Sequence, residues 1–382
     1  MKHASLIAAA LGVGIVAACT RSGDPPEVTQ PSEKPLEPRA APGGPKVTSY
    51  TQQAVDKVTL TALGGIDDPR AEWLAFAPDG ETWASVWMGG ARIFRGEQER
   101  AMYMQRHIAG GSVGFSRDGS LLRLGTHDLD VATGKLADQP ALPDLAAWAA
   151  TTGGHRAPPS LGIVGAVKSA DGKLLVVGAS GVTRDRREGL KKPTTGDEDW
   201  VIALDGASRA PSAVLWSGSG VHDRIAISDR HVAAGGMGGL LVFARDALTT
   251  PIDLTAQLGG VIALAWSPDG NLLAAIGQER KVAVWRTGSW GAPAASWDLP
   301  GNYASGLAFH PRRPLLLVGN KDGHLRVYGV AEPSLAKPPV LADVDIGGPV
   351  HALAVAPDGS NLRVAAGPPL SKILRYELQA TP

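Results

Sequence analysis

The segment LAWSPDG, at residues 264–270, returns with small changes along most of the chain. Strong copies read LAFAPDG at 74–80, VGFSRDG at 113–119 and LAVAPDG at 353–359. Weaker copies read AVKSADG at 166–172, IAISDRH at 225–231 and LAFHPRR at 307–313. The shortest interval runs from Asp79 to Asp118, 39 residues, and the longest from Asp171 to Asp229, 58 residues. The sequence therefore contains seven copies of one supersecondary unit.

Each copy follows the same pattern of strands and turns. Apolar residues alternate at Ile262, Leu264 and Trp266, which predicts a strand, and Ser-Pro-Asp-Gly then predicts a tight turn with glycine in the left-handed conformation. The continuous apolar run 272–276 predicts a second strand that is buried on both faces. A third strand is expected at 281–285, and a less regular fourth strand leads to the next copy.

This unit resembles the blade of WD-repeat proteins. Residues 315–328, LLLVGNKDGHLRVY, are the best match, with Asp322 in the turn between the second and third strands and Tyr328 where that family has tryptophan. The resemblance implies an all-β, seven-bladed β-propeller of four-stranded antiparallel blades over residues 47–382. No copy has the family's Gly-His pair and terminal Trp-Asp, so apolar packing is expected to stabilise the blades. The aspartates with a structural role in blade turns are Asp79, Asp118, Asp171, Asp269, Asp322 and Asp358.

Closure of the ring can also be predicted. The last copy supplies strands near 351–355, 362–365 and 373–378, and lacks a fourth. Residues 57–63, KVTLTAL, form a strand pattern that no repeat needs. In WD-repeat proteins an N-terminal strand completes the last blade, and we expect the same here, because closure removes exposed sheet edges.

The first nineteen residues have the pattern of a secretion signal. A basic start is followed by a mostly apolar run from Ala4 to Ala18, too short to span a bilayer. The run ends in Val16, Ala17, Ala18 and Cys19, which resembles the lipobox of bacterial lipoproteins. The resemblance implies a lipoprotein signal peptide at 1–18 and a covalent lipid, including palmitate, on Cys19. The alternative is an ordinary cleaved signal that happens to precede a cysteine.

Residues 19–46 are expected to tether the propeller to a membrane. Seven prolines and almost no large apolar side chains in 20–46 indicate a disordered, semi-rigid linker. Two or three acyl chains hold a protein durably on a bilayer. Because Thr20 is not the aspartate that marks inner-membrane retention in enterobacterial lipoproteins, we expect the outer membrane of a bacterial cell envelope, facing the periplasm or the cell surface.

Composition excludes several classes of function. Lysine plus arginine and aspartate plus glutamate both number 37, so the net charge of zero disfavours a nucleic-acid partner. The single cysteine excludes an internal disulfide framework and zinc sites that need two thiolates. No P-loop, dinucleotide fingerprint or HExxH motif is present, and the GGSVG at 110–114 begins an inner strand, where a nucleophile elbow needs a strand-to-helix turn.

One set of residues could carry chemistry. Alignment of the copies on the turn aspartate brings Glu72, His222 and His351 to one equivalent position, near the top entrance of the central channel. Such a set could bind a metal or an anionic ligand, or act in acid-base chemistry as in propeller lactonases. The alternative is that they are solvated rim residues on different blades, too far apart for shared coordination.

A charged insertion interrupts the third copy at 182–199. Its basic residues are Arg184, Arg186, Arg187, Lys191 and Lys192. It is either a solvated insertion between strands or a protruding loop that binds a partner, because insertions in repeat proteins often lie on the binding face.

The sequence thus predicts a membrane-tethered, non-enzymatic interaction scaffold, a monomeric ring that binds envelope proteins. No cofactor or metal is expected beyond the lipid on Cys19. The alternative is a periplasmic propeller enzyme or cofactor protein, lactonase-like or quinone-dependent, that uses the central channel.

Overall fold

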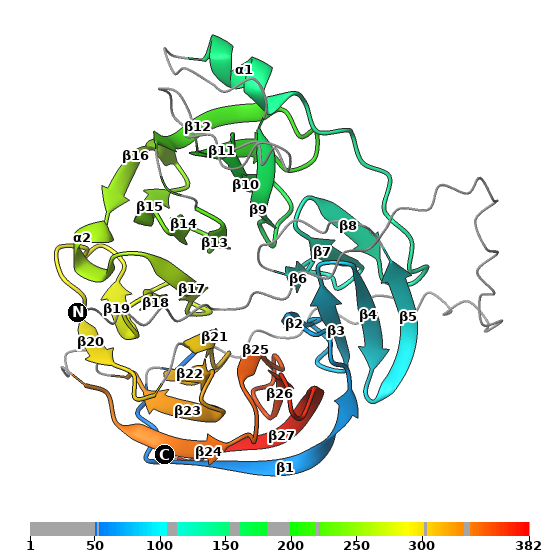
Figure 1. Cartoon of the computed structure of the whole chain (residues 1–382), viewed down its shortest axis with the longest axis vertical. Coiled ribbons are helices and arrows are strands. Elements are labelled where there is room, and N and C mark those ends of the chain that lie inside the picture. The colour runs from blue at the N-terminus through cyan, green and yellow to red at the C-terminus, as the bar shows by residue number, and fades with distance from the viewer. Residues whose placement is uncertain are drawn as a thin grey trace, which may run out of the picture. The chain divides into compact units, whose positions relative to one another are not determined.

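The computed structural model describes residues 50–51, 53–104, 113–152, 161–181, 199–218, 220, 222–301, 304–331 and 337–381. The lipobox residues Val16, Ala17 and Ala18, the lipid-attachment residue Cys19, the linker 20–46 and the five basic residues of the insertion lie outside this part of the chain. The described residues form seven antiparallel sheets around a common centre (Figure 1). The predicted all-β, seven-bladed propeller is therefore confirmed.

We number the blades in chain order and give their strands from the centre outward. Blade 1 contains β2 (Trp73–Phe76), β3 (Thr82–Trp87), β4 (Gly90–Arg95) and β5 (Gln98–Met104). Blade 2 contains β6 (Val113–Phe115), β7 (Leu121–Leu124) and β8 (His127–Asp130). Blade 3 contains β9 (Gly162–Lys168), β10 (Leu174–Ser180), β11 (Asp199–Asp205) and β12 (Pro211–Gly218).

The other four blades follow the same order. Blade 4 contains β13 (Arg224–Ile227), β14 (His231–Gly236), β15 (Gly239–Ala244) and β16 (Ala247–Asp253). Blade 5 contains β17 (Val261–Trp266), β18 (Leu272–Gly277), β19 (Lys281–Arg286) and β20 (Ala295–Asp298). Blade 6 contains β21 (Ala304–Phe309), β22 (Leu315–Asn320), β23 (His324–Gly329) and β24 (Val340–Asp345). Blade 7 contains β25 (Val350–Val355), β26 (Asn361–Ala366), β27 (Lys372–Thr381) and β1 (Lys57–Asp67).

The ring closes as the sequence predicts. Strand β1 pairs antiparallel with β27, from Lys57 opposite Thr381 to Asp67 opposite Lys372. The strand continues past residue 63, where its end is predicted. After a register shift between Ala62 and Gly65, residues 65–67 again pair with β27. The first and last segments of the ring thus share one sheet, which ties blade 7 to the start of the chain (Figure 1).

The turn between the first and second strands of a blade is held by a serine and an aspartate. In blade 2 the hydroxyl of Ser116 donates to the Asp118 carboxylate at 2.6 Å and accepts from the backbone N–H of Leu121 at 2.9 Å. The same pair recurs as Ser169 with Asp171 and as Ser267 with Asp269. Gly119 follows with a φ of +74°, which a residue with a Cβ adopts only at a cost.

These turns define two faces of the ring. We call the face that carries the first-to-second-strand turns the turn face, and the opposite face, where second strands join third strands, the mouth face. Asp79 and Asp358 lie in turn-face turns and accept from Thr82 and Ser360 respectively. Asp322 lies on the mouth face, where it accepts from the backbone N–H of His324.

Apolar side chains fill the space between neighbouring blades. All six residues of β18 and all six of β22 are buried, including the apolar runs 272–276 and 315–318 for which the sequence predicts burial on both faces. One core cluster joins blade 5 residues such as Ile276 to blade 6 residues such as Leu316. Each buried methylene contributes about 0.8 kcal/mol, so this packing is the main stabilising contribution to the ring.

Blade 2 departs from the expected four strands, because its sheet has three in the part of the chain that the structure describes. The next segment makes only an isolated bridge, Leu129 with Leu136, plus a bond from the Ala137 N–H to the Asp128 carbonyl. Prolines at 140 and 143 then prevent a longer ladder, since proline has no N–H to donate. Helix α1 (Leu145–Thr151) follows, and α2 (Thr255–Leu258) precedes blade 5. Neither of these described helices is long and apolar enough to cross a membrane.

Candidate functional site

The central channel opens into a cavity of about 520 Å³ lined by the first strands of several blades. Five residues at its wall lie each five positions before the first residue of their turn: Glu72, Asp223, Ile262, Ser305 and His351. Lys321, from the mouth-face turn of blade 6, completes the polar lining together with Arg224. The structure thus brings Glu72 and His351 to one cavity, on adjacent blades 1 and 7.

His222, the third residue of the predicted set, does not line this cavity. The turn of blade 4 is shorter than the others: the Ser228 N–H donates to the carbonyl of His231, three residues on, whereas that of Ser267 donates to Leu272, five residues on. Asp229 therefore lies one residue after Ser228, whereas Asp269 lies two residues after Ser267. Alignment of the copies on the aspartate thus displaces the residues of blade 4 by one position relative to the other blades. The true equivalent of Glu72 and His351 is Asp223.

His222 instead packs between blades 3 and 4, where it is 2% exposed. Its Nδ1 is 2.9 Å from the carbonyl oxygen of Gly220, so Nδ1 carries the proton and donates. The Asp199 carboxylate accepts from the Gly220 N–H at 2.9 Å, and the Trp216 ring lies 4.2 Å from the imidazole. Burial lowers the pKa of His222, so the ring is neutral at pH 7 and acts as a structural residue.

The charges around the channel mouth are mixed. Burial raises the pKa of Glu72, while burial and the nearby Lys321 ammonium lower the pKa of His351. Asp223 is paired with Arg224 at 3.5 Å. Among the described residues, no three histidine, cysteine or acidic side chains are placed to hold a metal ion. The mouth can therefore hydrogen-bond a polar ligand but does not match a metal centre.

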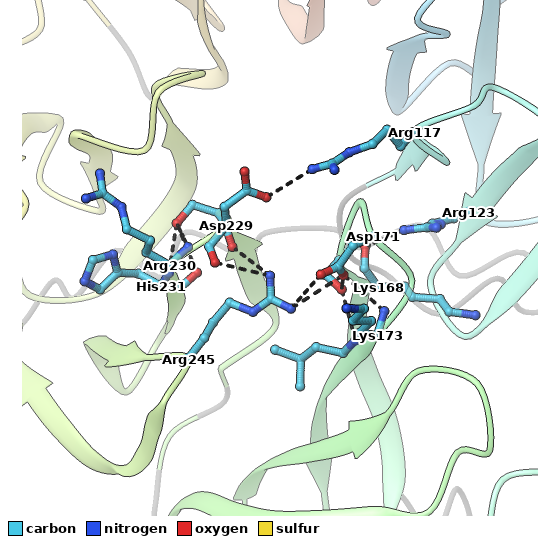
Figure 2. Close-up of polar contacts among 12 residues, drawn as sticks. Arg117, Arg123, Lys168, Asp171, Lys173, Asp229, Arg230, His231 and Arg245 are labelled. Atoms are coloured by element: carbon cyan, nitrogen blue, oxygen red, sulfur yellow. Dashed lines mark hydrogen bonds and ion pairs between the residues drawn. The ribbon is translucent and has the colours of Figure 1, made fainter. Parts of the chain in front are cut away.

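A second group of ionisable residues lies on the turn face of blades 2, 3 and 4 (Figure 2). Arg245 of blade 4 binds Asp171 of blade 3 at 3.1 Å, and Arg117 of blade 2 reaches Asp229 of blade 4 at 3.6 Å. Burial opposes ionisation of Asp171, but hydrogen bonds from Ser169, Lys173 and Arg245 lower its pKa to about 2. Arg245 therefore joins two neighbouring blades, and Arg117 reaches past blade 3 to blade 4. These ion pairs add to the apolar packing on which the sequence predicts that blade stability mainly depends.

The insertion of blade 3 joins β10 to β11. Its described ends pair through Ser180 and Asp199, at the mouth-face end of these strands. Residues 182–198, with the five cations of the proposed partner loop, lie outside the described part of the chain. The insertion therefore enters and leaves the ring on the same face as the channel cavity.

Comparison with known proteins identifies repeats within the ring. The family described as "WD domain, G-beta repeat" matches residues 250–286 and 296–329. A "66 kDa stress protein" from Physarum polycephalum is 31% identical over 81 residues, which are 21% of this chain and 14% of that protein. The chain therefore contains WD40 repeats, and the curated relative that it matches is similar to it over a small part of its own length.

Solved structures with the same fold cover most of the chain. One, titled "Crystal Structure of Mitotic Checkpoint Complex", has a TM-score of 0.60 at 18% identity and covers 94% of this chain and 98% of that one. The RRP9 WD40 repeats have a TM-score of 0.61 at 13% identity, covering 86% and 99%. U3-55K has a TM-score of 0.61 at 13% identity, covering 83% and 98%. At these identities the likeness shows the fold, a seven-bladed propeller.

Proposed function

We propose that this protein is a lipid-anchored, non-enzymatic interaction scaffold of a bacterial cell envelope. The observation that carries the proposal is a seven-bladed WD40 ring in which ion pairs such as Arg245 with Asp171 and Arg363 with Glu97 join adjacent blades. WD40 propellers typically bind other proteins, and one similar structure belongs to a chain of a named complex. The insertion, whose described flanking ends Ser180 and Asp199 lie at the mouth-face end of β10 and β11, supports the same function, because insertions in repeat proteins often lie on the binding face.

The anchor rests on the sequence Val16-Ala17-Ala18-Cys19. Acylation of the Cys19 thiol and of the new N-terminus would hold the chain on a bilayer, with residues 20–46 as the linker to the ring. Thr20 favours the outer membrane. The partners are then the membrane, through the lipid, and envelope proteins that bind a monomeric ring.

Membrane fractionation tests the anchor. A Cys19→Ser variant should lose palmitate labelling and leave the membrane fraction, because the thioether cannot form. A Thr20→Ser variant is the matched control and should stay in the membrane fraction. Continued sedimentation of the Cys19→Ser variant with membranes would contradict lipid anchoring.

Affinity capture tests the scaffold. The full chain, solubilised from membranes, should retain a protein at a fixed stoichiometry. Replacement of Arg184, Arg186, Arg187, Lys191 and Lys192 by alanine should release this protein if the insertion binds it. Recovery of no stoichiometric protein by the unaltered chain would contradict the scaffold function.

The cavity at the channel mouth favours a second candidate, a ligand-binding or enzymatic propeller of the lactonase-like or quinone-dependent class. Its support is a volume of about 520 Å³ that contains a half-buried carboxylate, Glu72, and a neutral imidazole, His351. Native mass spectrometry of the purified chain should then reveal a bound quinone that is lost in Glu72→Gln and His351→Asn variants. An unloaded protein without lactonase activity would exclude this candidate.

A further inference from the structure

The outermost strand of a blade leaves one backbone edge unpaired within its sheet, and most blades of this ring block that edge. Strand β16 contains Pro251, β1 contains Gly64 and a register shift, and β20 has only four residues. Helix α1 packs against β12, which begins at Pro211. Strand β24 carries two aspartates. Proline, glycine, charge, bulges and short length each discourage pairing with another strand.

Strand β5 of blade 1 has two charged residues, Glu99 and Arg100, and one bulge, but it lacks the proline, the glycine and the short length that block other edges. It is outermost in the order β2-β3-β4-β5, and its seven residues, QERAMYM, include neither proline nor glycine. Its only irregularity is a bulge opposite Ile93 and Phe94, toward the end away from the methionines. A long edge of this kind is a template for an added strand.

The side chains beside this edge are apolar and adaptable. All four methionines in the described part of the chain are exposed, and three belong to blade 1: Met88 at 57%, Met102 at 49% and Met104 at 61%. Methionine normally fills cores, and its flexible thioether suits surfaces that must fit an incoming apolar side chain. Three such residues in one blade indicate a binding surface.

The sheet register extends this surface inward. Met104 pairs with Gly90, which pairs with Trp87 in the next strand. Gly90 leaves room for the indole, because a Cβ there would lie 2.8 Å from Cζ2 of Trp87. The Arg70 guanidinium lies 4.2 Å from the centre of the Trp87 ring. Trp87 is 7% exposed, so it supports this surface from beneath, whereas methionine and arginine are among the residues enriched at protein interfaces.

The charge at the edge indicates what its partner carries. Arg100, at the bulge of β5, is exposed and makes no ion pair with any residue that the structure describes. The other arginine of this sheet face, Arg92, is already bound by Glu99 and Asp68. A segment that pairs with β5 therefore meets two apolar side chains and one cation, Arg100, without an ion pair among the described residues.

We propose that the β5 edge of blade 1 docks an extended segment of another protein, which adds a strand to this sheet. The segment carries two apolar side chains two residues apart, against Met102 and Met104, and a carboxylate against Arg100. Main-chain hydrogen bonds supply affinity in such strand addition, and alternate side chains supply specificity. This inference rests on the proposed scaffold function and identifies its surface and the chemistry of its partner.

Selection of displayed random peptides on the full chain tests the proposal. The enriched peptides should share an apolar-x-apolar pattern with a nearby aspartate or glutamate. Their affinity should fall by about tenfold or more on a Met102→Ser/Met104→Ser variant and stay unchanged on Met237→Ser. Met237 is the matched control because it is also exposed, at 71%, but lies in blade 4, away from the β5 edge. Selection on an Arg100→Glu variant should replace the acidic residue by lysine or arginine.

Two results would overturn the docking edge: no enrichment at all, or peptides that bind the Met102→Ser/Met104→Ser variant as well as the unaltered chain. Because these methionines are exposed, thermal unfolding should be unchanged in the variants, so loss of binding is not loss of fold. Peptides that depend on Glu72 or His351 would move the binding site to the channel mouth. In that case the edge is refuted while the scaffold, tested by capture of a native partner, stands.

Discussion

One histidine replaces the turn serine in blade 6 and also joins two blades. His310 Nδ1 accepts hydrogen bonds from the backbone N–H groups of Arg312 and Arg313 at 3.1 and 3.0 Å. Its Nε2 must then carry the proton, which it donates to the carbonyl of Gly359 in blade 7 at 3.1 Å. Only a neutral imidazole can accept at Nδ1 and donate at Nε2 at the same time. Protonation of Nδ1 would remove the acceptor for the two backbone N–H groups, so it would break the turn.

The stability of the ring should therefore depend on pH through His310. Burial, with the charges of Arg313 and Arg312, lowers its pKa to about 4. Its unfolded pKa is about 6.5, so the unfolded state binds more protons between these values and stability falls as pH drops from 6.5 toward 4. We expect a loss of about 3 kcal/mol over this window from this residue. Urea unfolding at pH 6.5 and at pH 4 should show a clearly smaller loss of unfolding free energy for His310→Gln than for the unaltered protein. An equal loss in the two proteins would contradict the role assigned to His310.

At the channel mouth, the sequence predicted part of the residue set. Glu72 and His351 were found because their turns contain the full Ala-Pro-Asp-Gly sequence, which keeps the alignment in register. Asp223 was missed because the turn of blade 4 is shorter, and counting from Ser228 in place of Asp229 would have identified it. Lys321 could not be found by repeat alignment, since it reaches the cavity from a mouth-face turn.

At the scale of strands, burial on both faces made the second strands predictable. Continuous apolar runs such as 272–276 can lie only between two blades. The outer strands contact one neighbour and the solvent, so their sequences carry a weaker pattern. In blade 2 this weaker pattern did not reveal that the fourth strand is missing. Prolines 140 and 143 end the hydrogen-bond ladder there. Arg209 of blade 3 covers the resulting edge by donating to the Thr126 carbonyl and the Gln139 side chain.

The closing strand β1 should be essential for stability. Val58 is 6% exposed and packs in the core between blades 6 and 7, while the next residue, Thr59, is exposed on the same strand. Val58→Asp should destabilise the ring by about 3 kcal/mol or more, because it buries a charge without a partner. Thr59→Asp should change stability by less than about 0.5 kcal/mol. Equal melting temperatures for the two variants would show that β1 does not close the ring in solution.

At the scale of the whole ring, one ion pair joins the end of the chain to its beginning. Arg363 of blade 7 binds Glu97 of blade 1 at 2.7 Å, and its guanidinium lies 4.5 Å from the centre of the Trp83 ring. Arg375 reaches the same carboxylate at 3.1 Å. Burial opposes ionisation of Glu97, but the two arginines prevail and lower its pKa. The contact spans 266 residues of sequence, so it forms only when the ring is closed.

The two ends of this contact should not be equivalent on mutation. The Arg363 side chain is 4% exposed, with Nε and Nη1 buried and unpaired among the described residues, whereas Glu97 is 49% exposed. Glu97→Gln leaves a buried charge without its partner and should cost about 3 kcal/mol. Arg363→Met removes that charge and should cost less, because a hydrophobic side chain of similar volume often replaces a buried ion at little cost.

Urea unfolding of the single and double variants measures this asymmetry. In the Arg363→Met background, Glu97→Gln should cost less than about 1 kcal/mol, because the carboxylate then keeps only its half-exposed partner Arg375. High salt should leave the contribution of Arg363 to the unfolding free energy largely intact. It should remove the contribution of the Arg117–Asp229 pair, because these side chains are 70% and 80% exposed. Strictly additive costs would mean that the pair is not coupled, and ring closure would then depend on the β1–β27 ladder and apolar packing alone.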